Sequence, residues 1–242
     1  MAVDLSGKVA VVTGSTRGIG VAINEALIDA GADVVVSARN QKACDQAAAR
    51  LSERRNGARV MGIACDVRDS IACRNLIERS VEASGRLDIL VNNAGIGAFG
   101  PVAEMTPETW DAVIGTNLNS LFYCTHAALP HLRRTGDAFV INIGSLAGKN
   151  AFPNGAAYNA SKFGLIGFSE ALMQEVRYDG IRVAYIMPGS VATEFNHPGP
   201  GRDHSWRIQP EDVARAVVDV LSYPSRSLTS RIELRPSQPP RK

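Results

Sequence analysis

Short apolar segments alternate with longer amphipathic segments along the whole chain, and no other feature of the sequence constrains the fold as strongly. Most of the apolar segments are rich in valine and isoleucine without polar alternation, which is typical of strands covered on both faces. Strands that alternate with helical segments indicate βαβ units around a parallel sheet. The seven predicted strands are Lys8–Thr13, Asp33–Ala38, Arg59–Cys65, Leu87–Asn92, Ala138–Gly144, Ile181–Met187 and Arg231–Arg235.

The segments between these strands have helical periodicity, and two of them have proline at or near a first helical turn, in Thr106-Pro107 and Gln209-Pro210. The predicted helices span residues 17–30, 40–55, 69–84, 107–134, 157–178 and 210–222. We therefore predict an α/β fold: a single doubly wound domain of the Rossmann type over residues 1–242, with a parallel sheet of about seven strands and helices on both faces. Residues 236–242 are predicted to form a surface tail.

The charge and cysteine content narrow the classes of partner. The chain of 242 residues has 26 basic and 24 acidic side chains, so its net charge of +2 does not indicate binding to nucleic acid or to an anionic membrane. It has no apolar run near the roughly 18 residues of a membrane helix, and its N-terminus lacks the pattern of a signal peptide. The four cysteines are irregularly spaced, which favours free thiols over a metal site or disulfides. We expect a cytoplasmic protein with a small-molecule substrate and no metal.

A glycine-rich turn follows the first predicted strand. Glycines allow a sharp turn and a close approach of the backbone to a pyrophosphate at a helix N-terminus. The spacing Gly-x-x-x-Gly-x-Gly differs from both the Gly-x-Gly-x-x-Gly dinucleotide pattern and the P-loop, and a tight turn without a ligand would also fit. The predicted phosphate-binding residues are Gly14, Ser15, Thr16, Arg17, Gly18, Ile19 and Gly20.

The end of the second predicted strand indicates which dinucleotide would bind. An acidic residue there would hydrogen-bond the ribose 2′-hydroxyl and repel a 2′-phosphate, but the chain has Ala38 and then Arg39. A guanidinium suits a phosphate, and Arg17 adds a second cation, so we predict NADP(H) over NAD(H). Both arginines could instead be ordinary surface charges. At the end of the third strand Asp66, followed by Val67, could accept a hydrogen bond from the adenine amino group, or cap a helix.

Tyr158 and Lys162 are four residues apart in a predicted helix and therefore share one face. A free phenol has a pKa of about 10, and a neighbouring ammonium together with a cationic nicotinamide would favour the phenolate. Ser145 follows the fifth predicted strand and could polarise a substrate carbonyl in the same cleft. Taken alone, the pair also fits a tyrosine ring covering a lysine stem.

Together with Asn92-Asn93-Ala94-Gly95, Asn117 and Pro188-Gly189, these motifs resemble those of the short-chain dehydrogenase/reductase family, from residue 5 to about residue 195. The resemblance implies that Tyr158 donates or accepts the substrate proton and that Ser145 orients the carbonyl. It implies that Lys162 binds the nicotinamide ribose and lowers the tyrosine pKa, and that Asn117 holds a water in a proton relay. Further cofactor contacts are implied for Asn93, Ala94, Gly95, Pro188, Gly189, Val191 and Thr193.

Within the family the chain looks nearest to the 3-ketoacyl-carrier-protein reductases and related carbonyl reductases. It departs from them after the last predicted strand, where a proline-rich tail replaces a Val-Asp-Gly-Gly type of segment, and in the compact segment 194–208. Both departures weaken the prediction of acyl-carrier-protein specificity. The resemblance also implies that the long helical segments 107–134 and 157–178 pair across a homodimer, often within a homotetramer.

We therefore expect an NADP(H)-dependent oxidoreductase that moves a hydride between nicotinamide and a carbonyl or secondary alcohol, with 3-oxoacyl thioester reduction as one candidate reaction. A non-catalytic NADP-binding sensor or scaffold is the alternative, although such a protein would be expected to lack part of the Ser145, Tyr158 and Lys162 set. The predicted substrate loops contain four aromatic residues that would suit an apolar or aromatic carbonyl, or would anchor the loops to the core. These residues are Phe99, Phe152, Phe195 and Trp206.

Overall fold

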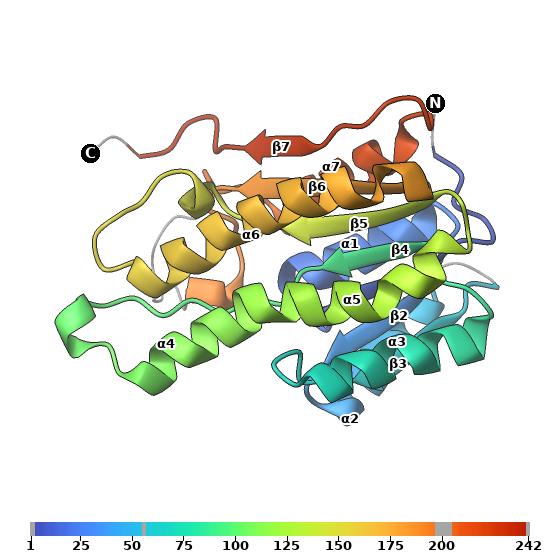
Figure 1. Cartoon of the computed structure of the whole chain (residues 1–242), viewed down its shortest axis with the longest axis horizontal. Helices are drawn as coiled ribbons and strands as arrows, with labels where there is room; N and C mark the ends of the chain where they lie inside the picture. The colour runs from blue at the N-terminus through green and yellow to red at the C-terminus, as the bar shows by residue number, and fades with distance from the viewer. Residues whose placement is uncertain (1–2, 55–56, 197–204, 241–242) are drawn as a thin grey trace.

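Seven strands pair in parallel in one sheet, in the order β3-β2-β1-β4-β5-β6-β7, within the computed structural model of the chain (Figure 1). The model describes residues 3–54, 57–196 and 205–240. The strands are β1 (Val9–Thr13), β2 (Asp33–Ala38), β3 (Val60–Ala64), β4 (Ile89–Asn92), β5 (Ala138–Ile143), β6 (Ile181–Pro188) and β7 (Arg231–Leu234). All seven predicted strands are confirmed, and the Rossmann-type α/β fold with them.

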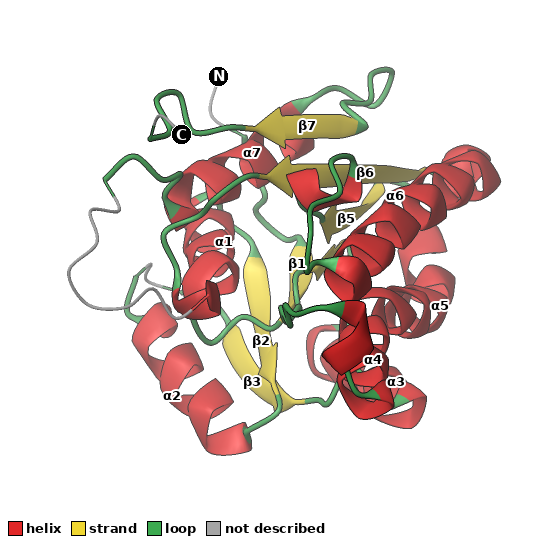
Figure 2. Cartoon of the chain, turned by 90° about the vertical axis from the view of Figure 1, so that its left-hand side faces the viewer, coloured by secondary structure: helices red, strands yellow, loops and turns green. Residues whose placement is uncertain are grey.

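Helices cover both faces of the sheet and bury alternate strand residues on each side (Figure 2). The first face packs against α1 (Gly18–Asp29), α2 (Gln41–Ser52) and α7 (Pro210–Ser222). The second face packs against α3 (Ser70–Ser84), α5 (Ser120–Arg133) and α6 (Ala156–Val176). Because β1 to β6 have apolar neighbours on both sides, their near-continuous apolar sequences are explained by the layers that enclose them.

The predicted helix 107–134 is interrupted in the structure. It consists of α4 (Pro107–Ile114), a wide π turn at Gly115–Asn119, and α5. Thr106 caps α4 by accepting a hydrogen bond from the backbone N–H of Thr109, as its place before Pro107 suggests. The other predicted helices are confirmed with ends that move by a few residues. Short 3-10 turns lie at Val102–Glu104, Leu146–Gly148, Arg177–Asp179 and Glu194–Asn196.

The sheet order reverses at β1, because β2 and β3 lie on one side of it and β4 on the other. Figure 2 looks onto the edge toward which the strands run, where the loops after β1, β4, β5 and β6 meet. Ligands of open α/β sheets bind outside the carboxyl ends of the strands at such a reversal. The topology therefore brings the glycine turn, Asn93, Ser145 and Pro188 to one edge of the sheet.

The C-terminal tail begins by packing against the body of the molecule. Pro236 lies against Gly189, where a side chain on the glycine would meet the proline ring at 3.1 Å. Residues 237–240 are exposed. Among the described residues, no helix combines the length and the apolar content that crossing a membrane would require.

Candidate active site

The glycine turn between β1 and α1 is built for a close approach of its backbone to other groups. Gly14 has a φ of 62°, and a Cβ there would lie 2.7 Å from the Cα of Ala94. A Cβ on Gly20 would lie 2.6 Å from both the Asn93 side-chain nitrogen and the Gly14 carbonyl oxygen. Neither position has room for a larger residue, so the glycines hold the turn against the loop after β4.

Thr13 and Asn93 fasten that contact with four hydrogen bonds. The hydroxyl of Thr13 accepts from the backbone N–H groups of Asn93 and Ala94, at 3.0 and 3.1 Å. The Asn93 amide nitrogen donates to the carbonyl oxygens of Thr13 and Gly14, both at 2.9 Å. The loop after β1 and the loop after β4 are therefore held together at the point where the strand order reverses.

The N-terminus of α1 is available to an anion. Its N-cap residue is Arg17, whose side chain makes no capping hydrogen bond. Uncapped N–H groups and the positive end of the helix dipole favour a phosphate at this position. Thr193, after β6, faces the same turn, because a Cβ on Gly18 would lie 3.5 Å from the Thr193 methyl carbon. The glycine backbone, the free helix end and the facing threonine fit a pyrophosphate.

The two predicted phosphate-binding arginines have different surroundings. Arg39, directly after β2, is exposed and has no hydrogen bond or ion pair with any residue that the structure describes. Arg17 instead pairs with Glu194, with 3.0 Å between its Nη1 and the carboxylate oxygen, and both side chains are 77% exposed. Arg39 is therefore the more available cation, whereas Arg17 already has an exposed and weak partner.

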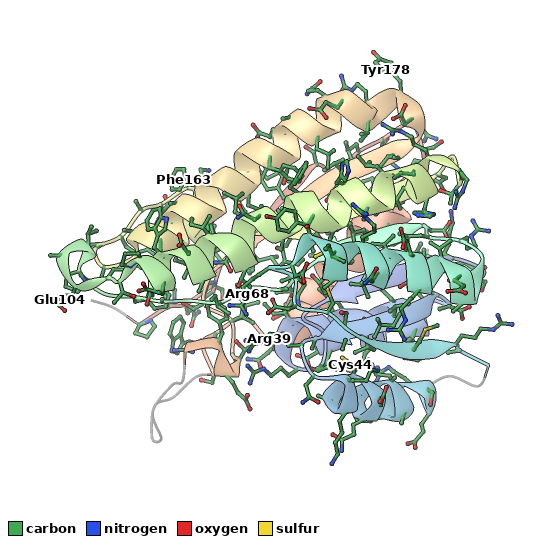
Figure 3. The ribbon with its side chains drawn as sticks, turned by 60° about the horizontal axis from the view of Figure 1, so that its bottom comes forward. Arg39, Cys44, Arg68, Glu104, Phe163 and Tyr178 are labelled. Carbon is green, nitrogen blue, oxygen red and sulfur yellow. The ribbon has the colours of Figure 1, made fainter. Side chains whose placement is uncertain are left out.

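Asp66 lies where the sequence predicts it, but its carboxylate is occupied. Arg68 forms a two-pronged contact with it, with distances of 2.6 Å from Nη2 and 3.0 Å from Nε. This hydrogen bonding lowers the pKa of Asp66, and Arg39 acts in the same direction through its charge. Figure 3 labels Arg39 and Arg68, which lie close together at this end of the sheet. A carboxylate oxygen can still accept from an adenine amino group, because Asp66 keeps 36% of its side chain exposed.

Tyr158 and Ser145 come together at the start of α6. Ser145 caps the 3-10 turn Leu146–Gly148, with its hydroxyl accepting from the Ala147 N–H at 3.1 Å. Although part of the Tyr158 ring remains exposed, burial raises the pKa of its phenol, and a side-chain hydrogen bond with Ser145 acts in the opposite direction. The phenol hydroxyl thus lies beside the hydroxyl of Ser145.

Lys162 lies one helical turn after Tyr158 and is 5% exposed. Its ammonium donates to the Ile143 carbonyl oxygen at 3.0 Å and lies 5.8 Å from the centre of the Tyr158 ring. Burial lowers the pKa of Lys162 to about 8. The sequence-based expectation that Lys162 lowers the tyrosine pKa has no counterpart among the causes that act on Tyr158 here, since burial dominates.

Asn117 lies inside the π turn and is fully buried. Its side-chain oxygen accepts from the Ile96 N–H at 2.8 Å, and its nitrogen donates to the Ile96 carbonyl at 2.9 Å and to the Ser161 hydroxyl at 3.1 Å. A Cβ on Gly95 would lie 3.5 Å from the Asn117 oxygen and 3.9 Å from the Lys162 nitrogen. The side chain of Asn117 therefore joins the loop after β4 to α6, a role that its sequence context does not predict.

Two residues of α6 that we did not select from the sequence also hold the site. Asn159 donates to the Ala147 carbonyl at 2.7 Å and accepts from the Phe152 N–H at 3.3 Å, which fixes the loop after β5. Ser161 accepts from Asn117 and donates to the Tyr158 carbonyl oxygen at 2.8 Å. Their polarity on a helix that packs against the sheet is the one signal in the sequence that points to them.

The segment after β6 closes the site on its other side. The Gly189 N–H donates to the Leu234 carbonyl oxygen at 2.9 Å, and Val191 pairs with Ile208 in a short parallel bridge. Thr193 in this segment faces the glycine turn, and the cofactor contacts of Pro188, Gly189 and Val191 stay predictions. Residues 197–204, with His197 and His204, lie outside the described residues. In the parts of the chain that are described, no group of three His, Cys, Asp or Glu side chains could hold a metal ion.

The chain matches the family model of the short chain dehydrogenases over residues 8–200. Among its relatives, the 3-oxoacyl-acyl-carrier-protein reductase FabG of Haemophilus influenzae is 37% identical over 191 residues, which cover 79% of this chain and 77% of that protein. The D-threitol dehydrogenase of Mycolicibacterium smegmatis is 34% identical over 228 residues, 90% of this chain and 87% of that protein.

Solved structures give the same result. A metagenomic short-chain oxidoreductase in complex with NADP is 36% identical, with a TM-score of 0.84 over 97% of this chain and 99% of that one. An alcohol dehydrogenase from the archaeon Thermococcus sibiricus, complexed with 5-hydroxy-NADP, is 28% identical, with a TM-score of 0.89 over the same shares of the two chains. Both proteins hold an NADP-type dinucleotide.

Proposed function

The chain belongs to the short-chain dehydrogenase/reductase family and is an oxidoreductase that acts on alcohol or carbonyl groups, and we propose that it reduces a carbonyl compound with NADPH, with Tyr158 as the proton donor. The observation that carries the proposal is the grouping of Tyr158 with Ser145 and the buried Lys162, whose nitrogen lies 5.8 Å from the centre of the Tyr158 ring. The alternative of a non-catalytic sensor is not supported, because the Ser, Tyr and Lys set is complete in sequence and in space.

Each of these residues has a task in the reduction. A bound NADPH would supply the hydride for the carbonyl carbon. The Tyr158 hydroxyl would give its proton to the carbonyl oxygen, so that an alcohol and the oxidised cofactor would result. Ser145 hydrogen-bonds the same oxygen and stabilises the charge that develops there. Lys162, held by the Ile143 carbonyl, faces the loop after β4 and would bind the ribose hydroxyls of the cofactor.

Proton donation by Tyr158 fits the reductive direction. Burial raises the pKa of its phenol, and the protonated phenol is the form that can donate to a carbonyl oxygen.

Replacing the Tyr158 hydroxyl tests the proposed function. Tyr158→Phe keeps the ring but removes the proton donor, so we expect kcat/KM for a reducible ketone to fall by about 10²- to 10⁴-fold. NADPH binding, followed by the fluorescence of the reduced nicotinamide, should be retained. Tyr185→Phe is the matched control. The Tyr185 hydroxyl lies away from the site, where it hydrogen-bonds the Glu170 carboxylate at 2.8 Å. A Tyr158→Phe enzyme with ordinary turnover would refute the proposal.

Preference for NADP(H) is proposed on the basis of Arg39. An exposed guanidinium without a partner among the described residues, next to a neutral Ala38 at the end of β2, suits a 2′-phosphate. Two solved relatives hold NADP-type dinucleotides, which supports the same assignment. The double variant Ala38→Asp with Arg39→Ala should lose most of its kcat/KM for NADPH and gain activity with NADH. A wild-type enzyme that favours NADH would contradict the proposal.

Reduction of 3-oxoacyl thioesters is a second candidate, favoured by the 37% identity with a 3-oxoacyl-acyl-carrier-protein reductase. The polyketide-synthase relative of Streptomyces virginiae, described as a ketoacyl reductase, is 40% identical over 190 residues and points the same way. Steady-state reduction of acetoacetyl-coenzyme A tests this candidate. A kcat/KM well above that for simple ketones would support it.

Assembly into a homodimer or homotetramer is proposed from the outer face of α4, α5 and α6. Phe122 and Phe163 are 53% and 46% exposed there, and Trp110 is 40% exposed. Figure 3 shows Phe163 on α6. Large apolar patches of this kind mark interaction surfaces. Light scattering should give a mass near two or four times 25.8 kDa, and Phe122→Glu should lower it. A wild-type mass of one chain would contradict this assembly.

A further inference from the structure

Two phenylalanine rings contact the Tyr158 ring, and a third contacts one of these two. Phe99 and Phe195 lie 5.5 and 5.9 Å from the Tyr158 ring, measured between ring centres, and Phe152 lies 5.9 Å from Phe99. They come from three different loops, after β4, β5 and β6. We call Phe99, Phe152 and Phe195 the aromatic collar. Trp206, the fourth aromatic residue of the predicted substrate loops, is not part of it and lies beside Arg207 instead.

The rings of the collar are seated on glycine backbones. A Cβ on Gly97 would lie 2.9 Å from atoms of both the Phe99 and Phe195 rings. A Cβ on Gly155 would lie 2.5 Å from the Phe152 ring. Each ring therefore has one side packed against main chain, which limits the positions that it can take. The collar is a formed part of the site and not a chance grouping of surface side chains.

Each ring also keeps an exposed surface. Phe99, Phe152 and Phe195 remain 47%, 41% and 40% exposed, although large apolar side chains normally bury most of their surface. The tilted and edge-on angles between the rings, from 43° to 67°, are those that aromatic side chains prefer in contact with one another. A further flat ring could join the cluster in the same way.

The charged side chains on the three loops lie outside the collar. Within the described parts of these loops they are Glu104, Lys149, Glu194 and Arg207. Lys149 pairs with Glu233 at 2.8 Å, and Glu194 pairs with Arg17 at 3.0 Å. Arg207 lies beside Trp206, 5.4 Å from the centre of its ring. The collar itself consists of three apolar rings, so an aromatic group is the part of a substrate that it would contact.

We infer that the substrate is a ketone or aldehyde with an aromatic ring attached to the carbonyl carbon. The inference rests on the proposed function and specifies its substrate class. The ring would enter the aromatic collar while the carbonyl oxygen meets the hydroxyls of Tyr158 and Ser145. Reduction converts this carbonyl to a benzylic alcohol, with the hydride taken from NADPH and the proton from Tyr158.

A matched pair of ketones tests the inference. Acetophenone and cyclohexyl methyl ketone have similar size, but only the first has an aromatic ring. We expect Phe99→Leu and Phe195→Leu each to lower kcat/KM for acetophenone relative to cyclohexyl methyl ketone by about 3- to 10-fold, as the strength of aromatic pairs suggests. The ratio of the two ketones cancels any effect of a variant on the position of Tyr158, since both substrates use the same hydroxyl.

Two further variants sharpen the comparison. Gly97→Ala should lower the same ratio, because its Cβ would displace two rings of the collar. Tyr178→Leu is the control, since Tyr178 is 91% exposed at the far end of α6 and should leave the ratio unchanged (Figure 3). Titration of the Tyr158→Phe protein with each ketone in the presence of NADPH measures binding without turnover, and acetophenone should bind more tightly.

The possible outcomes separate the two proposals. If the wild-type enzyme oxidises NADPH with neither ketone nor with acetoacetyl-coenzyme A, the proposed function fails. If it reduces ketones but the Phe→Leu variants leave the ratio unchanged, or if acetoacetyl-coenzyme A is by far the better substrate, the aromatic substrate class is wrong while the proposed function stands.

Discussion

Lys162 is a charged group that the fold buries at a cost, and replacing it should stabilise the protein at neutral pH. Its side chain is 5% exposed and makes one hydrogen bond, to the Ile143 carbonyl oxygen. No carboxylate pairs with it among the described residues, and burial lowers its pKa to about 8. Lys162→Met keeps the length and apolar stem of the side chain but removes the charge.

The pKa sets the size and the sign of the effect. An ordinary lysine has a pKa of about 10.4, and one pKa unit corresponds to about 1.4 kcal/mol, so the buried charge destabilises the folded state by about 3 kcal/mol below pH 8. Loss of the hydrogen bond offsets about 1 kcal/mol of the gain. Lys162→Met should therefore raise the free energy of unfolding by about 2 kcal/mol at pH 7.

The advantage of the variant should disappear as the pH rises. Between pH 8 and about 10.4 the unfolded wild-type chain binds more protons at Lys162 than the folded one, so wild-type stability rises through this window. Above it both states are neutral, and the variant should be about 1 kcal/mol less stable because the hydrogen bond is missing.

Urea unfolding of both proteins at several pH values, without added cofactor, measures this difference. Lys149→Met is the control, because Lys149 is 51% exposed in a surface ion pair and should show little change at any pH. A stability difference between Lys162→Met and the wild type that is the same at pH 7 and pH 10.5 would refute the reasoning.

Three further predictions concern pH and packing. The kcat/KM for NADPH should fall as the pH rises through about 8, because neutral Lys162 no longer attracts the cofactor. A kcat/KM that stays constant from pH 7 to pH 10 would contradict this prediction. Asn142→Ala should lower the free energy of unfolding, measured in urea, by about 3 kcal/mol. The reason is that the Asn142 side chain hydrogen-bonds Asn92 and Ser169 in the buried core, both at 2.9 Å. A loss below about 1 kcal/mol would contradict this prediction. Gly180→Ala should lower the free energy of unfolding by about 2 kcal/mol or more, because its Cβ would collide with the Gly136 carbonyl. Gly85 has a similar φ but open space around it, so Gly85→Ala should lower the free energy of unfolding by about 1 kcal/mol. Equal losses in the two variants would contradict this reasoning.

The strands and most helices could be predicted from the sequence because their apolar patterns are local. A run such as Val9–Thr13 is buried along its whole length, and nothing else in its surroundings is needed to identify it. The helix predicted over 107–134 shows the limit of this reasoning. Its interruption at the π turn has no local signal, because the turn is tied to the side chain of Asn117, whose partner Ile96 lies 21 residues away.

The candidate site could likewise be predicted from the sequence only where its signals are local. The glycine turn, Ser145, Tyr158 and Lys162 could be identified from spacing and residue type. The contacts that position them could not, since Asn159 bonds the Ala147 carbonyl and Ser161 bonds the Asn117 side chain, partners that only the folded chain brings near. The direction in which the pKa of Tyr158 shifts depends on how deeply its ring is buried. The ion pair between Arg17 and Glu194 joins residues 177 positions apart. Neither property is contained in a local pattern.

The most direct measurement of the central claim follows the hydrogen that reaches the carbonyl carbon. NADPH carrying deuterium at both C4 positions of the nicotinamide is supplied with acetophenone, and the product is analysed by mass spectrometry and NMR. We predict one deuterium on the carbinol carbon with the wild-type enzyme, and almost no product with Tyr158→Phe. An unlabelled carbinol carbon, or labelled product formed as fast by Tyr158→Phe as by the wild type, would contradict the account.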